Sequence, residues 1–132
     1  MLRKKIILAV DDLPSNLTKV REILGGIYDV RLAKNAQMAL SMMNRIDVDL
    51  VLLDIEMPGM SGFDFVDACR ENESKRDIPV IFLTSHASEK FVLRAARAGA
   101  KDYIHQPFEP HTLMAKISAI LSLRRPLINL SS

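Results

Sequence analysis

The sequence predicts one α/β domain in which five β-strands alternate with five α-helices. Three uninterrupted apolar runs, 6–10, 50–53 and 79–83, have the length and partly β-branched content of strands that are buried on both faces. Segments with apolar residues at helical spacing separate these runs from one another and from two weaker strand candidates. Such alternation is typical of a doubly wound parallel sheet covered on both faces, and we expect the three apolar strands at its centre.

The first strand and helix are bounded by recognisable stop signals. The run 6–10 ends at a pair of acidic residues, and Pro14 marks the first turn of a helix with apolar residues at helical spacing. A glycine pair that begins at Gly25 ends this helix. The weaker strand 29–33 then alternates apolar and polar side chains, which predicts an edge position with one face partly in water.

The middle of the chain predicts a helix, a central strand and a second helix. Asn35 is a favourable N-cap for a helix that extends to about Arg45. The aliphatic run 50–53 then ends at Asp54, and a Pro-Gly pair forces the chain to turn. Gly62 opens the next helix, in which apolar residues again recur at helical spacing.

The last third of the chain repeats the alternation twice. The apolar run 79–83 follows a polar loop, and Ser88 caps a helix that ends at Gly99. A short strand is expected at 102–105. Pro110 then stands at the first turn of the final helix, whose apolar stripe predicts packing against the sheet.

Length and charge place limits on the kind of protein this is. The chain has 132 residues with 18 basic and 16 acidic side chains, a balance that gives no reason to expect direct contact with nucleic acid or a membrane. The basic and apolar start resembles a secretory signal, but its apolar part is too short. The single cysteine, Cys69, cannot form an internal disulfide, which fits a reducing compartment. We therefore expect a cytoplasmic domain.

Polar residues follow all three central strands at the point where each strand ends. Asp11 and Asp12 follow the first, Asp54 ends the second and Thr84 ends the third. Parallel strands bring their carboxyl ends to the same edge of the sheet, where ligands of open α/β sheets bind. Three carboxylates placed this close repel one another unless a cation lies among them, and oxygen ligands suit Mg²⁺. An acidic pair after a single strand is often only a solvated turn. The prediction therefore depends on the occurrence of such polar residues at the ends of all three central strands.

Several motifs resemble those of the receiver domains of two-component response regulators, and the resemblance covers roughly residues 4–123. The resemblance implies a flavodoxin-like sheet with strand order 2-1-3-4-5. The motifs are Asp11-Asp12, Asp54-Ile55-Glu56-Met57-Pro58 with Gly62 beyond, Thr84-Ser85, Ala98-Gly99-Ala100-Lys101-Asp102-Tyr103 and Pro107-Phe108.

The resemblance also implies a role for each acidic residue. Asp54 would accept the phosphoryl group. Asp12 would ligate Mg²⁺ directly and Asp11 through water, and the main-chain carbonyl of Glu56 would be a further ligand. The donor would be a phosphohistidine of a histidine kinase or of a phosphotransfer protein. The chain would therefore catalyse only its own phosphotransfer and dephosphorylation, rather than act as an enzyme on a separate substrate.

The same resemblance implies a switch that changes a binding surface. Thr84 would move toward the phosphoryl group and Tyr103 would turn inward. The altered surface would comprise the fourth helix, fifth strand and fifth helix, and it would bind an output domain, a partner protein or a second copy of the chain. We expect the receiver domain to span residues 1–123 and residues 124–132 to form a C-terminal tail or the start of a linker.

One position departs from the family pattern. Gln106 stands before Pro107, where receiver domains normally have a lysine that contacts the phosphoryl group. A glutamine amide can donate a hydrogen bond but has no charge, so we expect weaker coupling to the switch. This leaves two hypotheses: a phosphoacceptor with altered switching, or a pseudo-receiver that binds its partner without phosphate. A third hypothesis is a phosphatase of the haloacid dehalogenase type. It is disfavoured because this chain has neither the Asp-x-Asp motif nor the catalytic lysine of that family.

Overall fold

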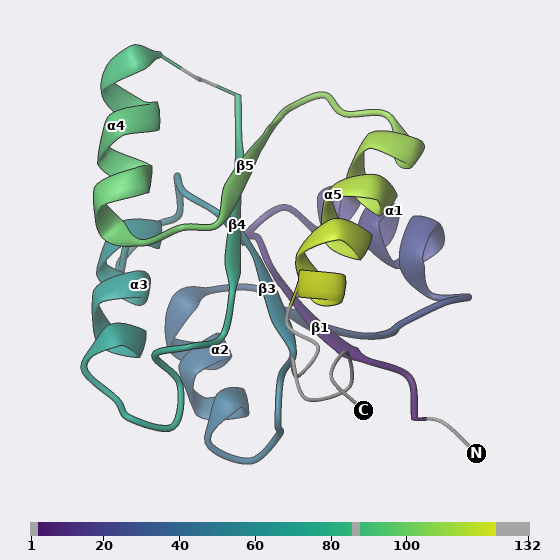
Figure 1. Cartoon of the computed structure of the whole chain (residues 1–132), viewed down its shortest axis with the longest axis horizontal. Helices are drawn as coiled ribbons and strands as arrows, with labels where there is room; N and C mark the ends of the chain where they lie inside the picture. The colour runs from purple at the N-terminus through teal and green to yellow at the C-terminus, as the bar shows by residue number, and fades with distance from the viewer. Residues whose placement is uncertain (1–2, 86–87, 124–132) are drawn as a thin grey trace, which may run out of the picture.

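Five parallel strands form one sheet in the order β2-β1-β3-β4-β5, with helices on both faces (Figure 1). The computed structural model describes residues 3–85 and 88–123, so the predicted tail at 124–132 lies outside the described part. The elements are β1 (Ile6–Val10), α1 (Pro14–Leu24), β2 (Asp29–Ala33), α2 (Ala36–Met43), β3 (Leu50–Asp54), α3 (Gly62–Arg70), β4 (Val80–Thr84), α4 (Glu89–Ala98), β5 (Asp102–His105) and α5 (Pro110–Leu123). The predicted fold class and strand order are confirmed.

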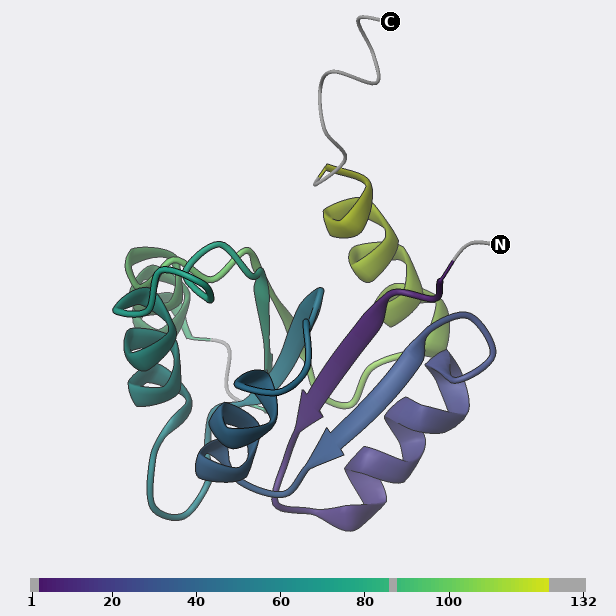
Figure 2. The ribbon, with the colours of Figure 1, turned by 90° about the horizontal axis from the view of Figure 1, so that it is seen from below.

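The three apolar runs form the centre of the sheet, as predicted. Every residue of β1 and β4 is buried, and β3 is buried up to Asp54 at its end. The two weaker strands, β2 and β5, lie at the edges. The strands point the same way, as the arrowheads of β1 and β2 illustrate in Figure 2, so their carboxyl ends lie at one edge. A strand that is flanked by two strands and covered on both faces has no side that faces water. This explains why apolar and polar residues do not alternate along the three central strands.

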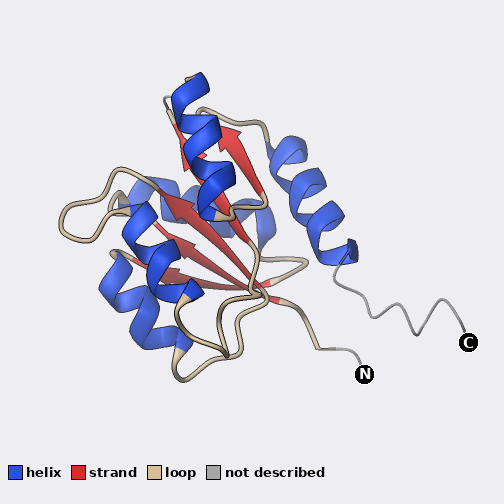
Figure 3. Cartoon of the chain, turned by 60° about the vertical axis from the view of Figure 1, so that its left-hand side comes forward, coloured by secondary structure: helices blue, strands red, loops and turns tan. Residues whose placement is uncertain are grey.

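The helices divide into two groups that cover opposite faces of the sheet. Helices α1 and α5 pack on one face, and α2, α3 and α4 on the other (Figures 1 and 3). Alternate residues of each central strand enter the two cores: Ile7 faces α1 and α5, and Leu8 faces the other three helices. Both cores therefore fix the orientation of the strands, and with it the edge at which their carboxyl ends meet.

Helix caps mostly follow the sequence prediction. The side chains of Asn35 and Ser88 accept hydrogen bonds from backbone N–H groups in the first turns of α2 and α4. Helix α2 is two residues shorter than the predicted extent to about Arg45. The helix ends at Met43, because the next N–H groups bond in tight turns to the carbonyls of residues 41 and 42. Strand β4 is shifted by one residue from the predicted run and ends at Thr84.

The C-terminal end of α4 is fastened to α3 through one arginine. The guanidinium of Arg70 donates hydrogen bonds to the carbonyl oxygens of Ala98, Gly99 and Arg76. Gly99 has a φ of 91°, and a Cβ there would lie 2.6 Å from the guanidinium, so both the backbone conformation and the contact favour glycine. The other end of α4 is held differently, by Phe91, whose ring lies 6.1 Å from that of Tyr103 between centroids.

Candidate functional site

Three acidic residues meet at the carboxyl edge of the sheet. Asp11 and Asp12 follow β1, and Asp54 is the last residue of β3. Strands β1 and β3 are neighbours in a register that pairs Val10 with Leu53, so the chain positions that follow, 11 and 54, lie next to each other. The sequence prediction that these residues come together is confirmed.

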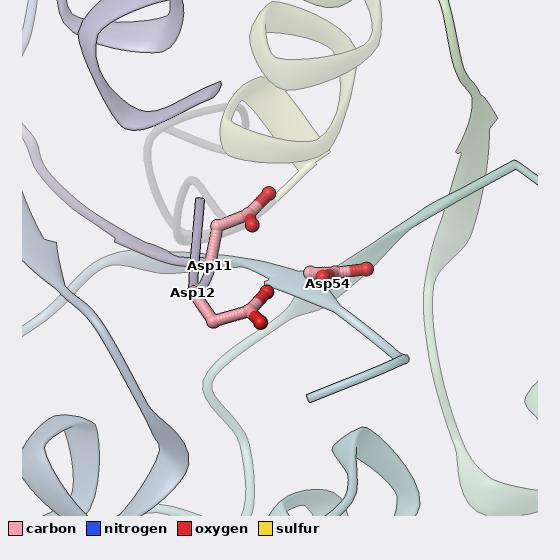
Figure 4. A group of neighbouring side chains, drawn as sticks. All are labelled: Asp11, Asp12 and Asp54. Carbon is pink, nitrogen blue, oxygen red and sulfur yellow. The ribbon is translucent and has the colours of Figure 1, made fainter. Parts of the chain in front are cut away.

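The carboxylates are close enough to share one cation. One oxygen from each of Asp11, Asp12 and Asp54 lies within 4.8 Å of the others, and Figure 4 shows the three side chains as neighbours. Asp11 is buried, Asp54 is half-buried and Asp12 is exposed. The donor set consists of hard oxygen atoms that solvent can reach from one side, which fits a Mg²⁺ ion that keeps several of its water ligands.

Asp11 is held in place by two hydrogen bonds. The Leu13 N–H donates to Oδ1 and the Asn16 side-chain amide donates to Oδ2, both at 2.9 Å. Asn16 was not among the residues predicted for the site. Its signal in the sequence is a polar amide in the first turn of α1, a short distance along the chain from Asp11. These bonds leave the orientation of the buried carboxylate little freedom.

Asp54 is shaped by the turn that follows it. The Glu56 N–H donates to its Oδ1 at 3.4 Å, and the Glu56 side chain is exposed. Gly62 then returns close to the strand end, where a Cβ would lie 3.0 Å from the Cα of Ile55. A side chain at position 62 would push this turn outward, which explains why a glycine occupies the position.

Burial and neighbouring negative charge make Asp11 and Asp54 harder to ionise. Burial, followed by the charges of Asp11 and Asp12, raises the pKa of Asp54 to about 7, although the Glu56 N–H opposes the shift. Burial also raises the pKa of Asp11, and the bonds from Leu13 and Asn16 oppose this. Such shifts are expected where carboxyl groups are taken out of water and placed beside like charges, and burial is the larger cause for both residues.

The pH dependence of stability tests the raised pKa of Asp54. The folded chain keeps a proton on Asp54 up to a pH of about 7, whereas the unfolded chain releases it near the ordinary value of 3.8. Between these values the folded state binds more protons, so its stability falls as pH rises. We expect Asp54→Asn to raise the unfolding free energy by about 1–2 kcal/mol at pH 8 in chelator, after allowance for solvent screening, and to change little near pH 4.

Thermal denaturation of both proteins at the two pH values measures this effect, with Asp67→Asn, on the exposed face of α3, as the matched control. An Asp54→Asn protein that is no more stable than wild type at pH 8 would contradict the shift.

The remaining predicted residues lie on β4, on β5 and just beyond β5. Thr84 is the last residue of β4 and is 5% exposed. The Gln106 N–H donates to the Thr84 carbonyl at 2.7 Å, which places Gln106 beside the end of β4. Its neighbour His105 is exposed. Tyr103 is half-buried and packs on the same core as α3 and α4.

A lysine of α1 also contacts the segment that contains Gln106. Lys19 Nζ donates to the Phe108 carbonyl at 3.3 Å and lies 4.3 Å from the centroid of the Phe108 ring. This contact was not predicted from the sequence, because 89 positions separate the two residues and Lys19 belongs to none of the motifs named above, although Phe108 does.

Comparison with known proteins gives a consistent result. The profile for "Response regulator receiver domain" matches residues 7–118. Chemotaxis protein CheY-3 of Vibrio cholerae is 34% identical over 116 residues, which cover 86% of this chain and 89% of that protein. A probable cyclic di-GMP phosphodiesterase of Vibrio cholerae is also 34% identical, over 119 residues that cover 90% of this chain but 27% of the relative.

Solved structures agree with the sequence comparison. The chemotaxis protein CheY4 of Vibrio cholerae superimposes with a TM-score of 0.84 at 30% identity, covering 88% of this chain and 98% of that structure. Several of the curated relatives are longer, and this chain spans half of their length or less. Within residues 3–85 and 88–123, none of the helices has the length and apolar character needed to cross a membrane.

Proposed function

Because the chain belongs to the response regulator receiver family, we propose that it accepts a phosphoryl group on the carboxylate of Asp54. The observation that supports this most strongly is the meeting of Asp11, Asp12 and Asp54 at the carboxyl edge of the sheet. Thr84 supports it further, since its hydroxyl belongs to the end of the next strand. The donor would be the phosphohistidine of a histidine kinase or of a phosphotransfer protein.

The acidic residues fit a magnesium ion. Asp11, Asp12 and Asp54 would hold it, with the main-chain carbonyl of Glu56 as a further ligand. The close approach of the three carboxylates and the raised pKa values of Asp11 and Asp54 indicate a site in which a cation would relieve repulsion. When bound, Mg²⁺ would neutralise charge on the phosphoryl oxygens and draw donor and acceptor together.

The chain's own residues would perform the transfer. A carboxylate oxygen of Asp54 attacks phosphorus in line, the new O–P bond forms as the P–N bond to the donor imidazole breaks, and the electron pair of that bond stays on the imidazole. The Thr84 hydroxyl and the Gln106 amide would then donate hydrogen bonds to the phosphoryl oxygens. Dephosphorylation would be a separate hydrolysis: water attacks phosphorus, the O–P bond to Asp54 breaks with its electron pair on the carboxylate, and inorganic phosphate leaves.

The signal would be a shift between two conformations. Thr84 would move toward the phosphoryl group and Tyr103 would turn inward, and only contacts that differ between the states can drive this change. The surface of α4, β5 and α5 would present the result to an output domain, a partner protein or a second copy of the chain. A hollow of about 680 Å³ along β5 and the start of α5, lined in part by Tyr103, His105 and Phe108, lies on this surface.

The domain limits belong to the same proposal. Residues 1–123 would form the receiver domain, and 124–132 would form a tail or the start of a linker. No separate substrate is needed, because the only reactions proposed are the chain's own phosphorylation and dephosphorylation.

Gln106 supports a second candidate, a pseudo-receiver that binds its partner without phosphate. A hydrogen bond that involves a charged group is worth about 1.5–3 kcal/mol, against about 1 kcal/mol for a neutral pair. The Gln106 amide has no charge, so it would hold a phosphoryl group less strongly than the lysine usual at this position. Incubation with acetyl phosphate and Mg²⁺ separates the candidates. A mass increase of one phosphoryl group supports the phosphoacceptor, and an unchanged mass with both acetyl phosphate and a cognate kinase supports the pseudo-receiver.

Gln106→Lys is expected to strengthen the response to phosphorylation. The added charge should stabilise the switched state by about 1 kcal/mol, which enlarges its population relative to the resting state about fivefold. Chemical shifts of the Tyr103 ring and of α4 amides, recorded with and without acetyl phosphate, measure this population. Gln37→Lys, at an exposed position of α2, is the matched control. Equal shift changes in wild type and Gln106→Lys would remove the proposed role of this position.

A further inference from the structure

The side chain of Lys19 joins α1 to the segment between β5 and α5. Its ammonium group donates to the Phe108 carbonyl at 3.3 Å and lies 4.3 Å from the centre of the Phe108 ring. The Lys19 side chain is half-buried, and within residues 3–85 and 88–123 no carboxylate forms an ion pair with it. A cation placed this way gains both a hydrogen bond and a favourable interaction with the ring face.

The segment that Lys19 contacts is short and is anchored at both ends. Gln106 is fixed to β4 through its N–H, which donates to the Thr84 carbonyl at 2.7 Å. Glu109 directly precedes α5, and its carbonyl accepts hydrogen bonds from the N–H groups of Thr112 and Leu113 in the first turn of that helix. Lys19 holds Phe108 between these two anchors. The backbone of the 106–109 segment is therefore held by contacts from three different elements, β4, α1 and α5.

Helix α1 also reaches the acidic cluster. Asn16 donates to Asp11 at 2.9 Å and stands three positions before Lys19, so both side chains project from the same side of the helix. One side of α1 thus contacts an acidic residue of the site at one point and the Gln106 segment at the next turn. This arrangement connects the acidic cluster with the 106–108 segment by a second route, besides the bond from Gln106 to Thr84.

We propose that Lys19 is a positioning residue for phosphoryl acceptance at Asp54, acting by holding the 106–108 segment so that the Gln106 amide faces the site. This inference rests on the proposed function, and it adds a residue outside the strand ends to the machinery. Lys19 does not touch the reacting atoms. In this proposal, Lys19 affects the rate of phosphorylation only by positioning Gln106. A lysine that merely stabilises the fold would affect the rate whether or not Gln106 is present.

The test uses two backgrounds. Lys19→Met keeps the apolar length of the side chain but removes the charge and the donor. We expect it to slow phosphorylation by acetyl phosphate about three- to tenfold, the equivalent of one weakened hydrogen bond. Lys19→Arg should restore the rate. In a Gln106→Ala background the same Lys19→Met change should alter the rate less than twofold, because the group that Lys19 positions is absent.

The controls separate positioning from folding and from metal binding. Lys5→Met removes an exposed lysine at the opposite edge of the sheet and should leave the rate unchanged. Calorimetric Mg²⁺ affinity of Lys19→Met should stay within twofold of wild type, since its acidic residues are intact. A rate loss of equal size in both backgrounds, or no loss in the wild-type background, overturns the inference.

A second readout keeps the inference testable if wild type accepts no phosphoryl group and the proposed function fails. The side-chain amide resonances of Gln106, recorded by NMR with Mg²⁺ present, report its placement directly. Lys19→Met should shift or broaden them, and Lys5→Met should not. Unchanged Gln106 resonances in Lys19→Met would overturn the positioning role independently of any phosphorylation.

Discussion

Asp54→Asn is expected to abolish phosphorylation of the chain by acetyl phosphate and Mg²⁺. The neutral amide oxygen of asparagine is a poor nucleophile and cannot form the acyl phosphate, so labelling should fall by about 100-fold or more. The fold should survive, because asparagine has the shape of the aspartic acid and the half-buried carboxyl already has a raised pKa. Intact-protein mass spectrometry after incubation measures the product.

Asp67→Asn is the matched control for this experiment. It makes the same substitution on the exposed face of α3, so its labelling should equal that of wild type. If Asp54→Asn retained full labelling, another side chain would be the acceptor, and peptide mapping would then locate the modified residue. That outcome would disprove the role proposed for Asp54 without changing the fold.

Asp12→Asn is expected to remove most of the magnesium affinity. Asp12 is exposed and follows the end of β1, so its removal should disturb the fold little. Loss of one unit charge close to a divalent ion costs on the order of 3 kcal/mol at the effective dielectric of a protein surface, which is about a 100-fold weaker Kd. Isothermal titration calorimetry at pH 8, where Asp54 is largely ionised, measures the difference.

The same change should slow phosphorylation, because charge on the phosphoryl oxygens would remain uncompensated. Asp67→Asn again serves as the control and should bind Mg²⁺ as wild type does. An Asp12→Asn protein with wild-type magnesium affinity would show that the acidic cluster is not the metal site.

The motifs at the strand ends predicted the acidic cluster because topology fixes where they go. The carboxyl ends of parallel strands all lie at the same edge of the sheet. The meeting of Asp11, Asp12 and Asp54 could therefore be predicted from the adjacency of their strands, without knowledge of other long-range contacts. Residues such as Asn16 and Lys19 could not be found in this way. Their roles depend on which side of α1 faces the site and on which loop lies within reach of a flexible side chain, and neither follows from local patterns.

Element ends were also less predictable than element types. Asn35 sets the start of α2 through a hydrogen bond that its own residue type implies. The end at Met43 instead lies where the next N–H groups form tight turns, and no glycine stands there to mark the end in the sequence. Similarly, the apolar run before Thr84 locates β4 within one residue but does not say which neighbouring backbone groups it will pair with.

The pairing of Val10 with Leu53 makes the site sensitive to changes in chain length. Each residue in a strand advances the chain by about 3.3 Å and reverses the side-chain direction, so a single deletion within 50–53 would move Asp54 out of reach and turn it toward a hydrophobic layer. A deletion in a surface loop on the far side of the molecule would leave the carboxylates in place. Variation in length among related genes should therefore gather in the connections and avoid the interior of β1 and β3.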